Sequence, residues 1–373
     1  MVDLGGCAAY WSPVRLDLLD CHAPEVEKIW CELDDASPRS FFTSWSWMEN
    51  WLACLPKDQL PELAVIRDDN KPLSAFFLRR APLVRLRVVR SRALYFNVTG
   101  NQRLDNLWIE YNGMVGRDVG IGKLVDLLPG DWDELFLPGL RSDAFGGLGE
   151  LVIRGFRVRM ERTVPVHFVE LARVRETGYL KLLGSQTRSQ VRRAQREAGD
   201  VKIEVATDLP TALAIYTQLV ALHQAQWTAR GEPGAFADPW FDRFHRRLIR
   251  QRFAHGEIQL LRLSNADGVI GALYNFVHRG RVYQYQSGMA TFENKHLKPG
   301  FLAHTAAIEH AAAAGHAVYD FLAGDMRYKK SLATTSGNLV WARVQRQRLR
   351  FFVEDRLREI VRSRRAARDP APS

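Results

Sequence analysis

The same order of predicted elements occurs twice along the chain, and this repetition limits its fold more than any other feature. Each half contains a β-hairpin, a third strand, a Gly-containing loop, a helix and a further strand. The halves have little sequence similarity, so the order of elements alone supports a duplication. With 373 residues, the chain is long enough for about two ordinary domains. We therefore predict two tandem α/β (α+β) domains, each with a mixed, mostly antiparallel twisted sheet flanked by helices.

In the first half, alternating apolar and polar residues predict strands, and polar or Gly-rich turns separate them. A Trp-rich helix is expected at 44–55 and a short amphipathic helix at 123–128. The expected strands are 62–67, 73–79, 94–98, 106–115, 134–137, 151–159 and 164–171.

In the second half, a three-strand meander follows three helices, and hairpin turns such as Asn-Ala-Asp-Gly join its strands. Asp208 and Pro210 are typical of the start of the second helix. The expected elements are helices at 177–197, 211–229 and 241–252, strands at 257–263, 269–278 and 281–289, a helix at 300–314, a strand at 317–322, a short helix at 327–332, a strand at 339–345, a basic helix at 351–366 and a disordered end at 369–373.

The formal net charge of +10 is concentrated in two segments. Residues 173–202 have a net charge of +5 and residues 341–373 a net charge of +6, so the remainder is close to neutral. A local basic patch can bind nucleic acid, anionic lipid or a phosphate-rich ligand, or it can be a solvated helix face.

The four cysteines all lie within the first 54 residues and form no Cys-x-x-Cys pair, which favours reduced thiols in a cytoplasmic protein. The first residues lack the basic start and apolar region of a signal peptide. No run approaches the ~20 apolar residues of a membrane-spanning helix. No clustered spacing of metal ligands is present, so we expect no metal.

Two Gly-containing loops at predicted helix starts could hold phosphate groups. Arg117, Gly120 and Gly122 precede the helix of the first half, and Lys298, Pro299 and Gly300 begin the Ala-rich helix of the second half. Glycine leaves backbone N–H groups accessible, and a helix N-terminus adds unpaired donors and partial positive charge. Either loop could equally be an ordinary strand-to-helix connection, since neither matches a Walker or dinucleotide motif.

These features together resemble the GNAT acyltransferases. Arg117–Gly122 looks like the acyl-CoA pyrophosphate motif, and the second half resembles CelD/BcsL-type acetyltransferases, relatives of the Fem-type aminoacyltransferases. The matching pieces are Ser185–Glu197, Gly231–His245, Lys298–Gly300 and Tyr319–Lys329.

The resemblance implies two tandem GNAT-like domains. The first, at 1–163, would be degenerate, and the second, at 164–349, would be the acyltransferase, with a basic helix and tail at 350–373. It also implies acetyl-CoA or another acyl-CoA as co-substrate. Because the Arg-x-x-Gly-x-Gly spacing occurs only in the first half, the half that holds the acyl donor stays open.

Acyl transfer needs a polarised carbonyl, a base for the nucleophile and an acid for the leaving thiolate, and a backbone N–H where two strands separate can polarise the carbonyl. We assign the base to Asp325 or Asp320 and the acid to Tyr328, with Lys329 holding phosphate or substrate. The structural alternatives are a helix cap for Asp325 and a packed aromatic for Tyr328.

Five further side chains are candidates for substrate binding. Gln284 and Gln286 lie on one face of a predicted strand, with tyrosines on the other face. His223 and Trp227 share a helix face, and His245 ends the Phe-His piece, although a lone histidine is usually structural.

Three functions remain open at this point. The leading one is an acyl-CoA-dependent N- or O-acyltransferase acting on a cell-envelope or exopolysaccharide precursor, with a small-molecule or saccharide acceptor and an anionic membrane surface as a further partner. The second is an aminoacyl-tRNA-dependent Fem-type transferase, in which the basic segments bind tRNA. The third is a non-catalytic binding protein that keeps the fold.

Overall fold

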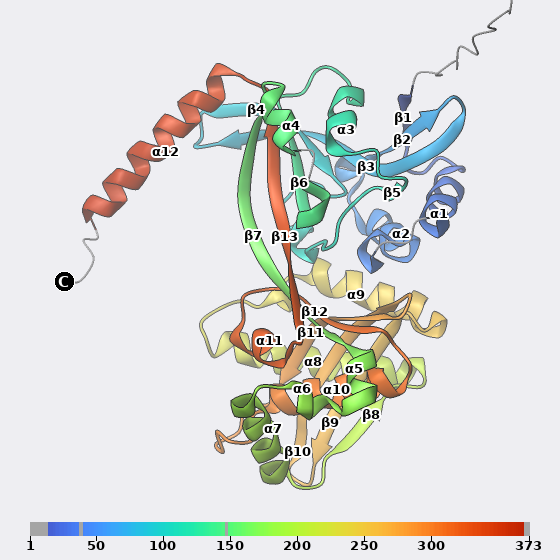
Figure 1. The fold of residues 1–373 in the computed structure, drawn as a ribbon, viewed down its shortest axis with the longest axis vertical. Helices are drawn as coiled ribbons and strands as arrows, with labels where there is room; N and C mark the ends of the chain where they lie inside the picture. Colours follow the sequence, from blue (N-terminus) through green and yellow to red (C-terminus); the bar gives the residue numbers. More distant parts are fainter. Residues whose placement is uncertain (1–13, 37–39, 146–147, 369–373) are drawn as a thin grey trace, which may run out of the picture.

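The computed structural model of the chain describes residues 14–36, 40–145 and 148–368 (Figure 1). Cys7 and the end at 369–373 lie outside this range, so the expectations for them are untested. The three described cysteines, Cys21, Cys31 and Cys54, are free thiols.

The first half of the chain contributes strands β1 to β7 and helices α1 to α4. Their bounds are β1 (Arg15–Asp20), α1 (Val26–Ala36), α2 (Trp45–Cys54), β2 (Glu62–Asp68), β3 (Lys71–Arg85), β4 (Val89–Phe96), β5 (Val115–Gly116), α3 (Ile121–Leu127), β6 (Glu134–Arg141), α4 (Leu148–Ile153) and β7 (Arg157–Glu170).

The second half contributes the remaining elements, and its helix starts follow local sequence signals. Asp208 accepts a hydrogen bond from the Thr211 N–H (2.8 Å) at the start of α8, as its sequence predicts. The bounds are α5 (Leu171–Thr177), α6 (Tyr179–Leu182), α7 (Ser185–Ala198), β8 (Lys202–Val205), α8 (Leu209–Thr228), α9 (Pro239–Arg252), β9 (Ile258–Asn265), β10 (Gly268–His278), β11 (Arg281–Met289), α10 (Pro299–Ala313), β12 (Val318–Ala323), α11 (Arg327–Leu332), β13 (Thr335–Gln345) and α12 (Leu349–Arg368).

One continuous mixed sheet runs through both halves in the order β1-β2-β3-β4-β6-β13-β7-β12-β11-β10-β9-β8, with β5 paired to β3. Most neighbours are antiparallel, whereas β4–β6 and β11–β12 are parallel. The prediction of an α/β fold with a mixed, mostly antiparallel sheet flanked by helices is confirmed.

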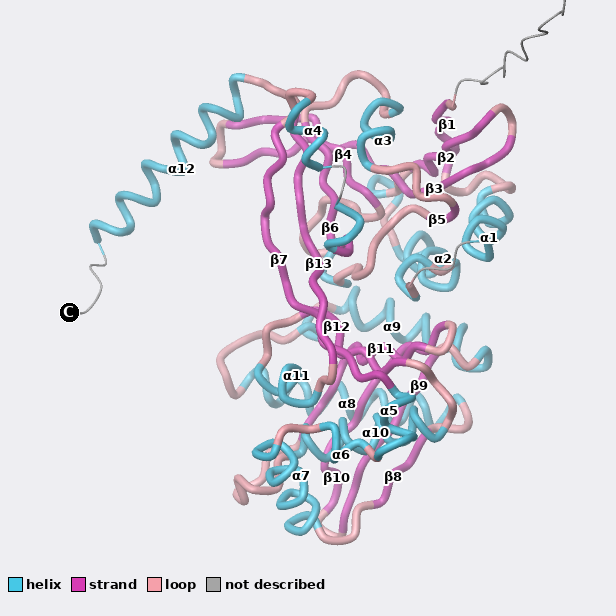
Figure 2. The backbone as a smooth tube through the Cα atoms, in the orientation of Figure 1, coloured by secondary structure: helices cyan, strands magenta, loops and turns pink. Residues whose placement is uncertain are grey.

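The long strands β7 and β13 join the two halves (Figures 1 and 2). They pair with each other from Arg157–Gln345 to Phe168–Thr335. In the first half β13 lies between β6 and β7, and in the second half β7 lies between β12 and β13. Each half therefore receives a strand from the other, and the domain boundary expected between 163 and 164 falls inside β7.

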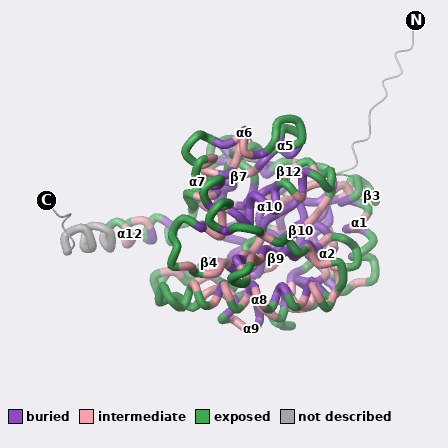
Figure 3. Tube along the Cα trace, turned by 90° about the horizontal axis from the view of Figure 1, so that it is seen from below, coloured by how far each residue is buried: buried purple, intermediate pink, exposed green. Residues whose placement is uncertain are grey.

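The hydrophobic core, formed by residues of the kind coloured as buried in Figure 3, is also shared between the halves. One cluster combines residues of α1 and α2 with residues of α8, α9 and the meander β9–β11. Phe41 stacks on Phe276 with ring centroids 4.4 Å apart, and Trp47 meets Phe244 edge-on at 5.0 Å. Such aromatic contacts bury large apolar areas, so they hold the halves together.

Two other clusters cover the opposite sides of the sheet. Residues of α3 and α4 pack on the first half, and residues of α5, α6, α7 and α10 pack on the second. Within the described part of the chain, no helix is both long and apolar enough to cross a membrane.

Three sequence-based expectations for individual elements were wrong. The expected strand 106–115 is mostly irregular, because Trp108 and Tyr111 adopt positive φ angles of 52° and 50°, which end an extended run. The expected strand 151–159 begins as helix α4 and becomes strand only at Arg157. The expected helix 177–197 is divided at Gly178 and Gly184 into α5, α6 and α7.

Candidate functional site

The second half contains an opening between two parallel strands. β11 and β12 pair only where Arg281–Tyr283 faces Val318–Asp320, and beyond these residues the strands are no longer paired. On the other side of β11, its pairing with β10 also shifts register by a bulge, since Tyr274 lies opposite Gln286 and Asn275 opposite Gln284. Where parallel strands separate, their main-chain groups need other partners, which can be the chain's own side chains or an extended ligand.

Asp320 lies at the base of this opening and is completely buried. Its Oδ2 accepts hydrogen bonds from the Tyr111 hydroxyl (2.6 Å) and from Arg281 (2.7 Å), and its Oδ1 accepts the Leu322 N–H (2.7 Å). Burial and the neighbouring carboxylate raise the pKa of Tyr111 far above its usual range. Because its two oxygens accept three hydrogen bonds, Asp320 fixes the positions of the Tyr111 and Arg281 side chains.

The end of β12 is held by a buried pair of opposite charges from the two halves. Glu110 accepts the Ala323 N–H (2.6 Å), and the Lys329 ammonium donates to the carbonyls of Leu322 (3.3 Å) and Ala323 (2.7 Å). Leu322 itself has a φ of 62°, which is unfavourable for a residue with a Cβ. Glu110 and Lys329 thus fix a strained turn where β11 and β12 separate.

Burial dominates the titration of this pair. It raises the pKa of Glu110 to about 7, and Lys329 partly opposes that rise. It lowers the pKa of Lys329, against the attraction of Glu110 and Asp320.

Asp325 and Tyr328 follow directly after this turn. Asp325 is exposed, and Gly324 before it has a φ of 144°. Tyr328 is half-buried and stacks on His304, with ring centroids 5.3 Å apart and an interplanar angle of 11°. Burial raises the pKa of Tyr328 above its usual range. The N-cap residue of α11 is Met326, so Asp325 does not occupy the cap position.

Gln284 lies opposite Asn275, on the α10 side of the sheet, whereas the bulge in β11 places Gln286 opposite Tyr274, which packs on the α8 side. The expectation that the two glutamines share one face was therefore wrong. Gln284 is buried beside Asn275 of β10, and Gln286 is partly exposed. Asn275 donates to Gln259 (2.9 Å), so a row of buried amides crosses the meander. Tyr283 and Tyr285 pack into the core on the α8 side.

The two histidines expected near substrate lie in aromatic surroundings. His245 is completely buried among Phe241, Tyr274 and Tyr285, and burial lowers its pKa to about 3. His223 contacts Trp227 at 5.7 Å between ring centroids, and burial lowers its pKa. Neither histidine has a hydrogen bond to the Asp320 group in the described structure.

The corresponding opening of the first half is filled by Asn112. β4 and β6 pair at Ala93–Tyr95 with Glu134–Phe136 and then separate. Asn112 enters the gap, and its side-chain amide donates to the carbonyls of Phe96 (3.1 Å) and Pro138 (3.0 Å). Its Oδ1 accepts a hydrogen bond from Asn97 (2.8 Å). The chain itself therefore occupies the place where an extended ligand would bind.

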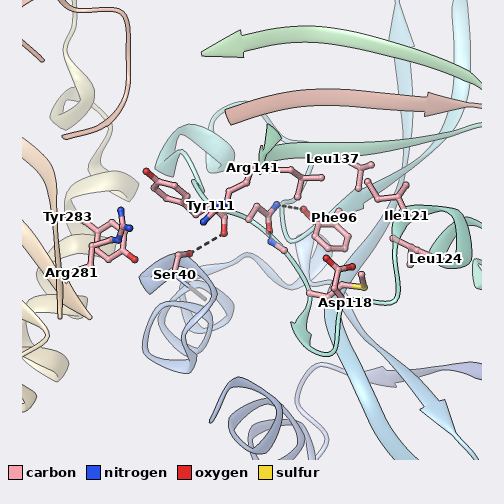
Figure 4. Close-up of a pocket in the computed structure, with 14 residues that line it drawn as sticks. Ser40, Phe96, Tyr111, Asp118, Ile121, Leu124, Leu137, Arg141, Arg281 and Tyr283 are labelled. Carbon is pink, nitrogen blue, oxygen red and sulfur yellow. Dashed lines mark hydrogen bonds between the residues drawn. The ribbon is translucent and has the colours of Figure 1, made fainter. Parts of the chain in front are cut away.

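A cavity of about 240 Å³ lies beside Asn112 at the junction of the halves (Figure 4). Ser40 closes one side and donates to the Tyr111 carbonyl (3.2 Å). The wall is apolar at Phe96, Ile121, Leu124, Leu137 and Leu140, and it is polar at Tyr111, Asp118, Arg141 and Arg281.

The two candidate phosphate loops differ in their surroundings. The Gly120 N–H already donates to the Asp118 carboxylate (2.9 Å), Arg117 is exposed, and a Cβ at Gly122 would lie 3.5 Å from the Glu150 carboxylate. These acidic groups oppose an anion.

The second loop begins the fifteen-residue helix α10. Lys298, the residue before the helix, has a φ of 45°. Its ammonium donates a hydrogen bond to Gln190 of the Arg-rich helix α7 (2.8 Å). Pro299 is the first residue of α10. A Cβ at Gly300 would meet no described atom within 4 Å. This loop is accessible and has basic side chains beside it.

The structure therefore brings Asp320 and Lys329 together and places Asp325 and Tyr328 just beyond them. Sequence analysis missed Glu110, Tyr111 and Arg281. The sequence does mark Glu110 and Tyr111 as unusual, because both carry polar groups inside a run expected to be a strand. The described residues contain no cluster of side chains able to hold a metal ion.

Comparison with known proteins identifies the fold. Residues 185–330 match a family model described as an acetyltransferase (GNAT) domain. This match runs from α7 to α11 and includes the β11–β12 opening. No curated protein matches the chain in sequence.

Three solved structures are similar over most of the chain. FemX has a TM-score of 0.55 at 10 % identity, over 84 % of this chain and 95 % of FemX. The C-terminal domain of a putative lysylphosphatidylglycerol synthetase from Agrobacterium fabrum has a TM-score of 0.50 at 10 % identity, over 86 % and 92 %. A conserved protein of unknown function from Bacteroides thetaiotaomicron has a TM-score of 0.51 at 11 % identity, over 89 % and 100 %.

The chain therefore has the fold of a GNAT-type acyltransferase, and the expected GNAT resemblance is confirmed at this level. The finer CelD/BcsL-type assignment stays a prediction.

Proposed function

We propose that the chain is an acyl-CoA-dependent N- or O-acyltransferase whose second half binds the donor. The observation that carries this proposal is the contrast between the two parallel-strand openings. Asn112 bridges the separated strands β4 and β6, whereas Glu110 and Lys329 bond only to β12, and no described side chain bridges β11 and β12 beyond their paired residues. The match of residues 185–330 to a GNAT domain supports the same half.

The donor's phosphates would meet the loop before α10. The Gly300 N–H and the partial positive charge of a fifteen-residue helix favour an anion there, and Lys298 adds a cation. Gly300 has space on its Cβ side, so a phosphate can approach the backbone. The bound thioester would supply an activated acyl group, with Lys329 and Glu110 holding the adjacent backbone.

The acceptor would bind at the junction cavity. Polar groups of Tyr111, Arg141 and Arg281 lie beside an apolar wall, a combination that suits a hydroxyl-bearing small molecule or saccharide. We therefore keep a cell-envelope or exopolysaccharide precursor as the proposed acceptor class.

The proton transfers are assigned to residues that follow the fixed turn. Asp325, which is exposed and able to reach solvent, would accept the proton of the attacking amine or hydroxyl. Tyr328, whose raised pKa keeps it protonated, would donate a proton to the leaving thiolate. Asp320 would position Tyr111 and Arg281.

Calorimetric titration with acetyl-CoA, longer acyl-CoAs and bulk tRNA tests the donor. The proposal expects acyl-CoA binding that Gly300→Asp abolishes and Gly120→Asp leaves unchanged. Asp is a suitable residue for the matched control, because Gly120 has a φ of 77° and Asp tolerates this conformation better than most residues.

Two results would overturn the proposal. Binding that is lost in Gly120→Asp and kept in Gly300→Asp would place the donor in the first half. Salt-sensitive binding of tRNA without acyl-CoA binding would instead support the aminoacyl-tRNA-dependent alternative.

A further inference from the structure

The hairpin between β3 and β4 carries an exposed apolar tip. Val84, Leu86 and Val88 are all exposed, Val88 to 67 %. Leu86 and Arg87 form the turn with positive φ angles of 49° and 62°. Gly or Asn would form such a turn without strain. The turn geometry therefore does not explain an exposed leucine at this position.

Helix α12 carries a second exposed apolar group on its first turns. Leu349 is 84 % exposed, and Phe352 and Val353 are each about half exposed. The helix projects from the body of the molecule (Figure 1). Phe351 and Glu354, on the opposite face, are buried. Leu349 is therefore largely open to solvent, while Phe352 is half exposed with Arg157 of β7 over its ring at 5.2 Å.

The base of α12 is fixed directly on the hairpin. Arg85 of β3 forms an ion pair with Glu354 (2.9 Å) and lies over the Phe351 ring at 5.7 Å. Arg350 donates to the Arg90 carbonyl of β4 (2.9 Å). The two apolar groups therefore belong to one region, which we call the hairpin–helix surface and define as Val84, Leu86, Val88, Leu349, Phe352 and Val353.

Arginines are concentrated on the hairpin side of this surface. Residues 80–92 contain five arginines and no acidic residue, and Arg80, Arg85 and Arg92 among them form ion pairs. Residues 349–359 of α12 contain three arginines and three acidic residues. Glu354 and Asp355 are engaged by Arg85 and Arg157. Arg87 and Arg90 form no ion pair with any residue in the described ranges. The hairpin–helix surface therefore combines apolar side chains with unneutralised arginines.

We propose that the hairpin–helix surface docks onto an anionic phospholipid bilayer. Apolar side chains interleaved with arginine are typical of segments that lie in the headgroup region, where the apolar groups enter the acyl boundary and the arginines meet lipid phosphates. Nucleic acid would attract the arginines but would leave Leu349 and Phe352 in water. A second copy of the chain would bring arginines against arginines.

Flotation of the full chain with vesicles tests the proposal. The vesicles are phosphatidylcholine alone, or phosphatidylcholine and phosphatidylglycerol in equal amounts. We expect binding to the anionic vesicles only, weakened by added salt.

Variants locate the contact. The double variant Leu86→Asn and Phe352→Ser should weaken binding about tenfold, because it removes two inserting side chains. Asn suits the positive φ of position 86, so the fold should be kept. The matched control is Ile203→Ser on β8, which removes an apolar side chain that is 50 % exposed and lies outside the hairpin–helix surface, and it should change nothing. The charge variant Arg87→Gln and Arg90→Gln should also weaken binding to anionic vesicles.

Several outcomes overturn the proposal. These are equal binding to neutral vesicles, full binding by the double variant, an equal loss in Ile203→Ser, or binding to bulk tRNA with none to vesicles. A dimer that the double variant dissociates, without vesicle binding, would assign the surface to self-association instead. Acyl-CoA titration of the double variant separates this proposal from the proposed function, because the hairpin–helix surface is fixed on β3 and β4 and shares no residue with the loop before α10.

Discussion

Tyr111, from the first half, donates a hydrogen bond of 2.6 Å to Asp320, from the second half. The two residues are separated by 209 positions in the sequence. Arg281 completes the group with its own bond to Asp320 (2.7 Å). A buried charge needs partners, so this group requires both halves to be docked. The site at the base of the β11–β12 opening is therefore a property of the whole chain.

Substituting Tyr111 and substituting Asp320 should each destabilise the protein, and the Asp320 variant should be the less stable of the two. Tyr111→Phe leaves Asp320 with Arg281 and the Leu322 N–H, so we expect a loss of about 2 kcal/mol in the free energy of unfolding. Asp320→Asn leaves Arg281 without its counter-ion, for a loss of about 3 kcal/mol. Urea unfolding measures both.

The control for these variants is Glu204→Gln, which removes the carboxylate of the largely exposed pair with Arg262. Its effect should be less than about 1 kcal/mol. An Asp320→Asn loss no larger than that of Glu204→Gln would contradict the interpretation of the Tyr111–Asp320 bond.

The elements that sequence predicted best are those determined by neighbouring residues. The meander strands expected at 257–263, 269–278 and 281–289 match β9, β10 and β11 within two residues at each end. Their alternation and their short polar turns are local signals. The start of α8 at Asp208 and Pro210 was likewise readable from the sequence.

Local signals did not predict that each half of the sheet receives a strand from the other half. Alternation indicates that β7 and β13 are strands, but it does not identify their neighbours. The partners of β7 are β12 and β13, both more than a hundred residues further along the chain. The sequence order suggested two separate domains, whereas pairing across that distance depends on the whole tertiary structure.

The residues of the candidate site also fall into two groups, those predictable from a local motif and those that depend on tertiary structure. The closing motif of the second half supplied Asp320, Asp325, Tyr328 and Lys329 together. Two of the three groups missed, Glu110 and Tyr111, come from the first half; their position in an expected strand marks them as unusual, but it does not indicate that they meet β12. Their roles follow from the docking of the halves.

Asp325→Asn and Tyr328→Phe should each lower turnover while leaving the fold intact. If Asp325 accepts a proton and Tyr328 donates one, each loss should reduce kcat by about a hundredfold. Circular dichroism and acyl-CoA binding should match the wild type, because Asp325 is exposed and Phe keeps the ring that stacks on His304.

The measurement is steady-state kinetics once a donor has been identified. Asp267→Asn, an exposed acid in the β9–β10 turn, is the matched control and should keep full activity. Wild-type turnover in both test variants would remove the two assignments.

Glu110→Gln should change how stability depends on pH. The pKa of Glu110 is raised to about 7 from an ordinary value of 4.5, so the folded protein holds a proton there that the unfolded chain releases. The wild type should therefore lose stability, relative to Glu110→Gln, as pH rises from 4.5 to 7. We expect a relative change of roughly 1–3 kcal/mol.

Urea unfolding of both proteins at several pH values measures this difference. The matched control is Glu232→Gln, which removes an exposed carboxylate and should leave the pH dependence of stability unchanged. A constant difference between wild type and Glu110→Gln across this range would show that the carboxyl is not held protonated by burial.

His245→Phe should remove a pH dependence of the opposite sign. The pKa of His245 is lowered to about 3 from 6.5, because the ring is enclosed by aromatic side chains. The unfolded chain therefore binds a proton that the folded protein does not, and this contribution to stability is lost as pH falls below 6.5. Between pH 7.5 and pH 5, we expect the wild type to lose about 2 kcal/mol relative to His245→Phe.

Phenylalanine keeps the ring packing against Phe241 and Tyr285, and it removes one polar contact, that of Nδ1 with the Tyr274 hydroxyl (3.4 Å), since Nε2 has no hydrogen-bond partner among the described residues. Urea unfolding at the two pH values measures the change, and acyl transfer should be unaffected. Unchanged pH dependence would contradict a neutral buried imidazole. A loss of activity with unchanged stability would instead return His245 to the substrate-binding residues expected from the sequence.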